Sequence, residues 1–339
     1  MAPRDRFVRL ARTLGPEAPA RLRDRTAVVV GCGALGSSVA ALLVRSGVGA
    51  LRLIDRDVVE ERNLADQTLY TEEDAAAARP KAEAAAFHLR AIDRATRLEP
   101  RVADFCPENA EALVRGADLV LDCADNLETK YLINDVAVAT GTPWVYAGCA
   151  GTLGTVLAVL PGETHCFRCI WPEPPPRVDG CETLGILAAT AAFLAAVQAT
   201  EGLKILLGQT GELLGGVTRF DLWTAEVRKV PIPDFPTEER SCPACGLRDF
   251  RFLRGEARPG ATVLCGRDTV LLSSGGAGFD FAGARERLRE RLPVEGDEDC
   301  LRFAAEGHRF LVFANGKALV HGTDDPGKAR ILYGRYLLP

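Results

Sequence analysis

The sequence has no apolar run that is typical of a signal peptide or of a membrane span. Its first residues, MAPRDRFVRLARTLG, break every apolar stretch with arginines, and a signal peptide needs a continuous apolar core. The most apolar stretch, residues 186–207, is rich in alanine and contains Glu201 and Lys204. We therefore expect a buried helix or a subunit contact there, and not a membrane span. The expected compartment is the cytoplasm.

A basic surface patch is also missing. The 41 Lys and Arg residues are outnumbered by 46 Asp and Glu residues, the formal net charge is −5, and no cluster of positive charge stands out. Because nucleic-acid binding depends on such clusters, we expect no nucleic-acid partner. The composition, 47% hydrophobic and 26% charged, is that of an ordinary globular protein, and 339 residues allow one large domain plus a small one.

Cysteines, in contrast, are numerous. The chain has 11, an odd number that excludes a complete set of disulfides within it. Four form two Cys-x-x-Cys pairs, Cys166 with Cys169 and Cys242 with Cys245. Four thiolates suit tetrahedral Zn²⁺ and leave no open coordination position, so we predict a structural zinc staple between distant loops. A redox role is the alternative, but neither pair is predicted to open a helix after a strand.

Strands and helices are predicted to alternate over the first 140 residues. The apolar segments 26–30 and 50–55 are typical of buried strands, and helices are expected over 34–45, 80–92 and 127–140. Such alternation implies a mostly parallel sheet with helices on both faces. We therefore predict a doubly wound, Rossmann-like α/β fold.

The last part of the chain is predicted to form a small α+β domain. A linker with glycine and proline near residues 254–260 interrupts the apolar pattern. Beyond it we expect strands within 261–273 and 301–321, each followed by a helix. The predicted domains are therefore residues 1–254 and 255–339.

A glycine-rich loop follows the first predicted strand and opens a helix. Gly31, Gly33 and Gly36 form GxGxxG. The first glycine permits a tight turn, the second removes a Cβ that would block a phosphate, and the third lets helix and strand pack closely. Asp55 ends the next strand, where a carboxylate can accept both ribose hydroxyls. This set predicts a nucleotide site without deciding which nucleotide it binds.

Residues 3 to 246 resemble the ThiF/MoeB/HesA family, which includes the adenylation half of ubiquitin-activating enzymes. The motifs that carry the resemblance are the glycine loop, the segment from Asp55 to Gln67, Arg79-Pro-Lys81, the segment from Leu121 to Asn126 and the two cysteine pairs. The resemblance implies ATP-dependent adenylylation of the C-terminal Gly-Gly carboxylate of a small ubiquitin-like carrier protein, with release of pyrophosphate. Thiamin and molybdopterin synthesis, tRNA thiolation and ubiquitin-like conjugation all use this chemistry.

The resemblance also assigns roles to residues. It makes Asp125 the catalytic carboxylate that binds Mg²⁺, and it makes Arg9 an arginine that a homodimer inserts into the neighbouring subunit's site. A carboxylate substrate is already ionised at neutral pH, so the reaction needs positioning and charge stabilisation more than a general base. The residues implied around the nucleotide are Gly31, Gly33, Gly36, Asp55, Asp57, Arg62, Asn63, Gln67, Lys81 and Asn126.

A further cysteine, Cys181, lies in the loop where sulfur-transferring relatives carry a reactive cysteine. It is a candidate for thioester or persulfide formation, with a sulfurtransferase as the sulfur donor. Asp179 and Glu182 flank it, and negative neighbours disfavour the thiolate. Some relatives adenylate without an essential cysteine, so a structural role is the alternative.

One position departs from the family. Relatives commonly have Asn-Leu-Gln-Arg-Gln where this chain has Asn-Leu-Ala-Asp-Gln, which puts Asp66 in place of an arginine. A carboxylate ~4 Å from a phosphate is repelled by several kcal/mol at an effective dielectric near 20. Either Arg62 takes over, or the loop is shifted, or ATP use is weakened. A non-catalytic module that binds a ubiquitin-like partner is therefore one alternative. An NAD(P)-dependent oxidoreductase is another, which leaves Lys81 and the cysteine pairs without a role.

Overall fold

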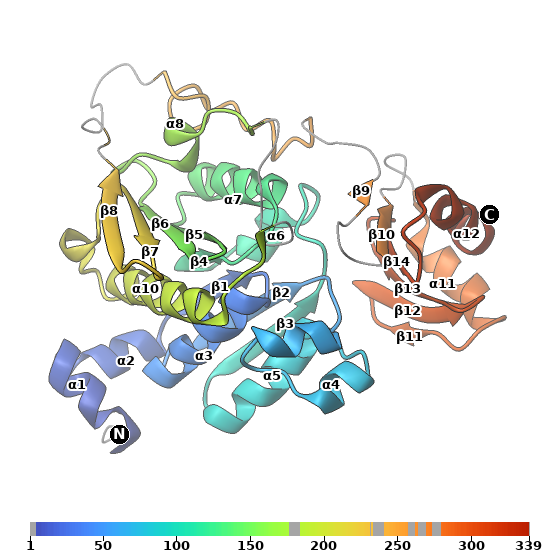
Figure 1. Cartoon of the computed structure of the whole chain (residues 1–339), viewed down its shortest axis with the longest axis horizontal. Helices are drawn as coiled ribbons and strands as arrows, with labels where there is room; N and C mark the ends of the chain where they lie inside the picture. The colour runs from blue at the N-terminus through green and yellow to red at the C-terminus, as the bar shows by residue number, and fades with distance from the viewer. Residues whose placement is uncertain are drawn as a thin grey trace. The chain divides into compact units, whose positions relative to one another are not determined.

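The computed structural model describes residues 5–175, 184–230, 232, 241–256, 262–263, 269–272 and 279–338. Contacts between residues divide the chain into two compact units, Met1–Glu256 and Ala257–Pro339. Both are drawn in Figure 1. Each unit is described by itself below.

The first unit is built on an eight-stranded sheet in the order β3-β2-β1-β4-β5-β6-β7-β8. The parallel strands are β1 (Thr26–Val30), β2 (Ala50–Asp55), β3 (Arg97–Val102), β4 (Leu119–Asp122) and β5 (Trp144–Ala150). The antiparallel strands are β6 (Leu153–Val159), β7 (Val217–Asp221) and β8 (Glu226–Val230). The chain runs outward from β1 to β3 and returns to β4 beside β1, so the order reverses between β1 and β4. Open α/β sheets bind ligands at such a point.

Helices cover both faces of this sheet, which confirms the predicted doubly wound fold. The helices are α1 (Val8–Leu14), α2 (Ala18–Arg23), α3 (Ala34–Ser46), α4 (Glu72–Ala76), α5 (Lys81–Ile92), α6 (Ala110–Val114), α7 (Leu127–Thr140), α8 (Phe167–Ile170) and α10 (Ala188–Leu206), with short 3₁₀ turns η1 (Asp5–Phe7), η2 (Glu61–Ala65) and η3 (Thr210–Glu212). In Figure 1, α3, α5 and α10 lie on one face and α6 and α7 on the other. The glycine loop therefore opens a helix on one face, and Asp125 precedes a helix on the other.

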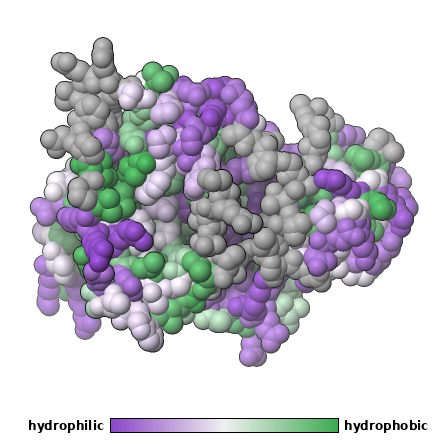
Figure 2. Space-filling view, turned by 45° about the horizontal axis from the view of Figure 1, so that its top comes forward, coloured by the Kyte–Doolittle hydropathy of each residue, from purple (hydrophilic) through white to green (hydrophobic). Residues whose placement is uncertain are grey.

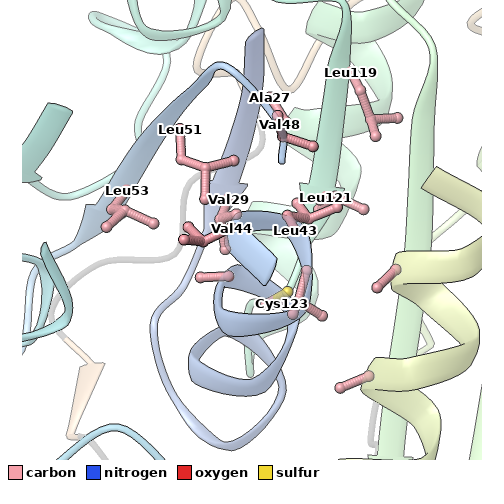
Figure 3. Close-up of a cluster of buried hydrophobic side chains, with 14 of the residues drawn as sticks. Ala27, Val29, Leu43, Val44, Val48, Leu51, Leu53, Leu119, Leu121 and Cys123 are labelled. Atoms are coloured by element: carbon pink, nitrogen blue, oxygen red, sulfur yellow. The ribbon is translucent and has the colours of Figure 1, made fainter. Parts of the chain in front are cut away.

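The core of the first unit lies between the sheet and α3. Figure 3 shows side chains of β1, β2 and β4 meeting Leu43 and Val44 of α3. Leu119 and Leu121 of β4 are also close to α10, because a Cβ at Gly202 would lie 2.9 Å from Leu119 and 3.3 Å from Leu121. Close packing of α3 and α10 against the strands fixes the strand ends from which the loops of the candidate site begin.

The second unit is an antiparallel sheet with two helices, so the predicted α+β class is confirmed. Its order is β11-β12-β13-β14-β10-β9. The elements are β9 (Thr262–Val263), β10 (Thr269–Leu272), α11 (Phe281–Arg289), β11 (Glu295–Gly296), β12 (Cys300–Ala305), β13 (His308–Phe313), β14 (Ala318–His321) and α12 (Pro326–Leu337). Phe303 and Phe310 stack across β12 and β13 with ring centroids 4.6 Å apart, and Leu332 and Tyr333 of α12 belong to the same core.

Among the described residues, no helix combines the length and the apolar character that a membrane crossing needs. On the face shown in Figure 2, apolar residues form separate patches among hydrophilic ones. The apolar stretch 186–207 is instead α10, which packs against the sheet and buries Leu194 and Ala195.

Candidate active site

The glycine loop crosses the carboxyl end of β1, and its three glycines serve different needs. Gly31 has φ +91°, and a Cβ there would lie 2.5 Å from the carbonyl oxygen of Cys123. A Cβ at Gly36 would lie 1.9 Å from the carbonyl oxygen of Gly31. At Gly33, by contrast, the nearest described atom would be Gln67 Nε2 at 3.9 Å. Packing thus requires Gly31 and Gly36, whereas the space above Gly33 is left open for a ligand.

Asp55 supports the glycine loop from the end of β2. Its Oδ2 accepts a hydrogen bond from the Cys32 N–H at 2.6 Å, and its Oδ1 accepts one from the Asp57 N–H at 2.7 Å. Burial raises the pKa of Asp55, although nearby Lys81 opposes the shift. A carboxylate oxygen has room for two hydrogen bonds. Asp55 is therefore able to accept the expected bonds from a ribose while it holds these two backbone N–H groups.

Lys81 supplies a buried positive charge at the start of α5. Its side chain is 5% exposed, and its Nζ lies 3.7 Å from Asp57 Oδ2. The Tyr70 hydroxyl lies 2.6 Å from the Cys32 carbonyl oxygen and 3.2 Å from that of Lys81, so it links the glycine loop to α5. Nothing in the sequence marks Tyr70, because its role depends on contacts across the fold.

The turn η2 and the residues after it lie over the glycine loop. Asn63 closes a capping box, since its Oδ1 accepts the Glu60 N–H at 3.0 Å. Gln67 is 9% exposed, and its Oε1 is buried without a hydrogen-bond partner among the described residues. Because Gln67 Nε2 is the described atom nearest to a Cβ built at Gly33, this amide group lies beside the open space above that glycine.

Asp66 is half-buried close to Lys81. Burial raises the pKa of Asp66, and the charge of Lys81 opposes the shift in part. Its Oδ1 is buried without a hydrogen-bond partner among the described residues. Arg62, the expected substitute for the missing arginine, places its Nε 2.6 Å from Glu60 Oε2, and its side chain is 45% exposed. The structure therefore directs Arg62 toward Glu60, and its phosphate role stays a prediction.

The segment after β4 forms the other side of the site. Asn126 caps α7 by accepting the Thr129 N–H at 2.9 Å, and its Nδ2 lies 3.3 Å from Asp125 Oδ1. The close approach of Gly31 to the Cys123 carbonyl brings this segment against the glycine loop. The structure thus assembles the predicted glycines, Asp55, Lys81 and Asp125 around the point where the strand order reverses.

Arg56 is a second fixed cation, which the sequence motifs did not single out. Its Nη1 lies 2.7 Å from Asp104 Oδ1, and its side chain is 17% exposed. Burial lowers the pKa of an arginine, yet the surrounding carboxylates, Asp104 first and Asp125 among them, raise the pKa of Arg56 overall. The sequence signal that could have identified Arg56 is its position directly after Asp55, inside a segment that the family resemblance already covered.

The four paired cysteines come together as predicted. Their sulfur atoms all lie within 4.8 Å of one another. The Cys166–Cys242, Cys166–Cys169 and Cys169–Cys245 sulfur distances are 3.6, 3.7 and 3.4 Å. A tetrahedral zinc site with bonds of about 2.3 Å places its sulfurs about 3.8 Å apart, whereas a disulfide needs about 2.0 Å. The cluster therefore has the donors and spacing of a zinc site.

Helix α7 holds both cysteine loops. Asn134 Oδ1 accepts the Phe167 N–H at 2.9 Å, next to Cys166. Asp135 pairs with Arg168 at 3.2 Å and accepts the Phe252 N–H at 3.1 Å. One helix therefore connects the segment at Asp125, before its first turn, to the cysteine cluster beside its middle.

The other two predicted catalytic residues cannot be joined to the site. Arg9 lies on α1 with its side chain exposed, and α1 buries none of its residues in a single chain. Cys181 lies outside the described residues.

Comparison with known sequences gives a consistent set of relatives. The ThiF family matches residues 5–244. The sulfur carrier protein ThiS adenylyltransferase of Bacillus subtilis is 37% identical over 326 residues, 96% of this chain and 96% of that protein. The sulfur carrier protein adenylyltransferase of Thermus thermophilus is 38% identical over 240 residues, 69% of this chain and 86% of that protein. The adenylyltransferase and sulfurtransferase MOCS3 of Sus scrofa is 36% identical over 266 residues, 77% of this chain and 57% of that protein.

Solved structures of E. coli MccB share the fold. MccB with AMPCPP and MccA gives a TM-score of 0.64 at 20% identity, with 73% of this chain and 75% of that chain covered. MccB with ATP gives 0.60 at 21% identity, with 72% and 75% covered. At this identity the likeness shows the fold alone.

Proposed function

The chain belongs to the ThiF family, and from that premise we propose that it adenylylates the C-terminal Gly-Gly carboxylate of a ThiS-type sulfur carrier protein. The observation that carries the proposal is the arrangement at the sheet's switch point. There, the glycine loop leaves open space above Gly33, Tyr70 links that loop to the backbone of the buried cation Lys81, and Asp125 follows the end of β4. The alignment with the Bacillus relative, which is 37% identical and covers 96% of this chain, supports the choice of carrier.

In the proposed reaction, a carboxylate oxygen of the carrier attacks the α-phosphorus of ATP. A P–O bond forms, the bond to the bridging oxygen breaks, and pyrophosphate leaves with that electron pair. The backbone N–H groups at the start of α3 and the ammonium of Lys81 oppose the charge on the phosphoryl oxygens. Because both reactants are anions, fixed donors that are already in place lower the barrier without reorganisation.

Two metal ions belong to this proposal. Mg²⁺ would neutralise phosphate charge when bound, and Asp125 with its hard carboxylate oxygens at the end of β4 fits that ion. Zn²⁺ would be held by Cys166, Cys169, Cys242 and Cys245, whose sulfur spacing supports it. The zinc role is structural, because four thiolates leave no position for a substrate.

The proposal includes a homodimer, in which Arg9 reaches the neighbouring subunit's site. The exposure of α1 and Arg9 in a single chain supports it. We also propose that a separate sulfurtransferase supplies sulfur to the activated carrier, with Cys181 as the acceptor of the acyl group or of sulfur. The MOCS3 relatives are named as adenylyltransferase and sulfurtransferase, which supports this pairing of the two activities.

The division into an adenylation domain at 1–254 and a small domain at 255–339 completes the proposal. The Thermus relative aligns over 69% of this chain and the Bacillus relative over 96%. The family match ends at residue 244, whereas the alignment with the Bacillus protein extends well into the C-terminal part, which supports a division of the chain into two domains.

Pyrophosphate exchange tests the function. With ATP, Mg²⁺ and a ThiS-type carrier, the protein should incorporate labelled pyrophosphate into ATP and yield an acyl-adenylate by mass spectrometry. The same carrier with an amidated C-terminus is the control, because it has no carboxylate to attack. The proposal fails if exchange is absent with every Gly-Gly carrier. Binding of the carrier without exchange would favour the non-catalytic module, and hydride transfer with NAD(P) would favour the oxidoreductase.

Asp66→Arg tests whether the unusual carboxylate limits the enzyme. Asp66 is half-buried near Lys81, so replacing its charge should lower the KM for ATP about tenfold, which corresponds to about 1.4 kcal/mol. Steady-state exchange assays measure the change, and Glu61→Gln, on the exposed side of η2, controls for a general loss of negative charge. If the wild type shows no pyrophosphate exchange and Asp66→Arg does, the claim that the natural protein uses ATP efficiently is contradicted.

A further inference from the structure

Lys130 is a buried lysine that none of the predicted roles uses. It lies in the first turns of α7, is 6% exposed, and contacts the carboxyl end of β4 and the middle of β5. Its Nζ donates to Asp122 Oδ2 at 3.0 Å, to the Ala124 carbonyl at 2.7 Å and to the Ala147 carbonyl at 3.1 Å. An ammonium group has three N–H donors, so these three acceptors use its full capacity.

The same short segment is fixed by two more side chains. Asp122 Oδ1 accepts the Ala124 N–H at 3.0 Å. Gln198 of α10 donates from its Nε2 to the Asp122 carbonyl at 2.8 Å and to the Val145 carbonyl at 2.9 Å. Strand β4 ends at Asp122, and its pairing with β1 and β5 ends there too. Side chains of α7 on one face of the sheet and of α10 on the other hold the backbone at this point.

Asp125 sits between two fixed points as a result. Lys130 holds Ala124 on one side, and Asn126 caps α7 on the other by accepting the Thr129 N–H. A carboxylate that binds a metal beside a phosphate must be held to within about 0.5 Å, which demands support from the residues behind it. We propose that Lys130 is the positioning residue that fixes Asp125 in the nucleotide site. This proposal rests on the function proposed above.

The charge of Lys130 is part of this role. Burial alone disfavours the ammonium, but its neighbours, Asp122 first and then Tyr146, together outweigh that effect and raise the pKa of Lys130 overall. Lys130 Nζ also lies 5.0 Å from the ring centroid of Tyr146 on β5. A neutral side chain would leave the fully buried Asp122 carboxylate without its cation, and the Ala124 carbonyl would lose its donor.

The test compares Lys130→Met with Lys130→Arg in the full chain. Lys130→Met should weaken Mn²⁺ binding with a non-hydrolysable ATP analogue, measured by electron paramagnetic resonance, between about 10- and 100-fold. It should raise the Mg²⁺ concentration for half-maximal exchange by a similar factor, with little change in the KM for the carrier. Without any nucleotide, amide hydrogen exchange should accelerate at Ala124. Lys130→Arg should recover most of each loss, because it keeps the charge and the donors.

Lys204→Met is the matched control. Lys204 pairs with the buried Glu201 and donates to the Glu212 carbonyl, outside the nucleotide site. Should Lys130→Met fail to fold, Asp122→Asn removes the buried charge and keeps an acceptor for the Ala124 N–H, and the same Mn²⁺ deficit is expected. Equal losses of stability in the Lys130 and Lys204 variants, with unchanged Mn²⁺ binding, would overturn the proposal. If the wild type shows no pyrophosphate exchange, the proposed function fails. The measurements of Mn²⁺ binding and amide hydrogen exchange still decide the role of Lys130.

Discussion

Gly33→Ala should weaken ATP binding strongly while the protein stays folded. The backbone at Gly33 has φ −77° and ψ −145°, so its φ lies outside the left-handed range that favours glycine, and the added Cβ would meet no described atom closer than 3.9 Å. The Cβ would instead occupy the space that the loop leaves for the phosphates. We expect ATP affinity to fall at least about 100-fold, or about 2.8 kcal/mol, as measured by calorimetry, with a smaller loss of stability than Gly36→Ala shows.

Two other glycines make this prediction specific. Gly36→Ala should destabilise the protein itself, because its Cβ would lie 1.9 Å from the Gly31 carbonyl oxygen. Gly211→Ala, in η3, adds a Cβ where no described atom lies within 4 Å, and it should change neither stability nor ATP affinity. Normal ATP binding by Gly33→Ala would show that the open space is not the phosphate site.

Elements with a continuous apolar pattern could be predicted from the sequence. The strands β1 and β2 are buried apolar runs, and the capping glycine after α3, Gly47, has the left-handed conformation expected of a helix end. Strand β3 was not predicted, because its residues RLEPRV include a proline and three charged residues and form no continuous apolar run. The order of the sheet puts β3 at an edge, where a proline and exposed charges are tolerated. The helical segments η2 and α4, between β2 and α5, were not predicted either.

The candidate site divides in the same way. The glycine loop and the cysteine pairs are local motifs, so their chemistry can be read from neighbouring residues. Tyr70, Lys130 and Gln198 have no such motif. Gln198 reaches Asp122 from 76 positions away, and a lysine in a helix is usually solvated, so only the fold shows that Lys130 is buried. Residues that position others are defined by packing, whereas residues that bind phosphate or metal are defined by their own chemistry.

Arg168→Met should be among the most destabilising single substitutions in the first unit. Arg168 and Asp135 are both fully buried, and Arg168 Nη1 also donates to the Asp249 carbonyl at 2.6 Å. Removing the arginine leaves Asp135 as an uncompensated buried charge, which typically costs about 3–5 kcal/mol. All three tryptophans of the chain, Trp144, Trp171 and Trp223, lie in this unit, so the denaturant midpoint by tryptophan fluorescence reports on it alone.

The pH dependence of the stability lost in Arg168→Met identifies its physical cause, and zinc retention is a second test. Burial already raises the pKa of Asp135, with Arg168 opposing the shift, so the variant should raise it further. A native carboxyl with a raised pKa costs stability when it is ionised, above that pKa, and the cost is relieved as the pH falls through it. The deficit of Arg168→Met should therefore shrink from pH 7 toward pH 5, and adding Asp135→Asn should restore most of the stability at pH 7.

Zinc retention extends the same argument to the cysteine cluster. Asp135 holds Arg168 beside Cys169 and accepts the Phe252 N–H beyond Cys245, so losing the pair should loosen both loops. A chelator should then remove zinc faster from Arg168→Met than from the wild type. Arg254→Met, which removes an arginine that pairs with Asp249 and Glu256 at the surface, is the control and should retain zinc normally. A pH-independent deficit in Arg168→Met would show that lost packing, and not the stranded charge of Asp135, destabilises the unit.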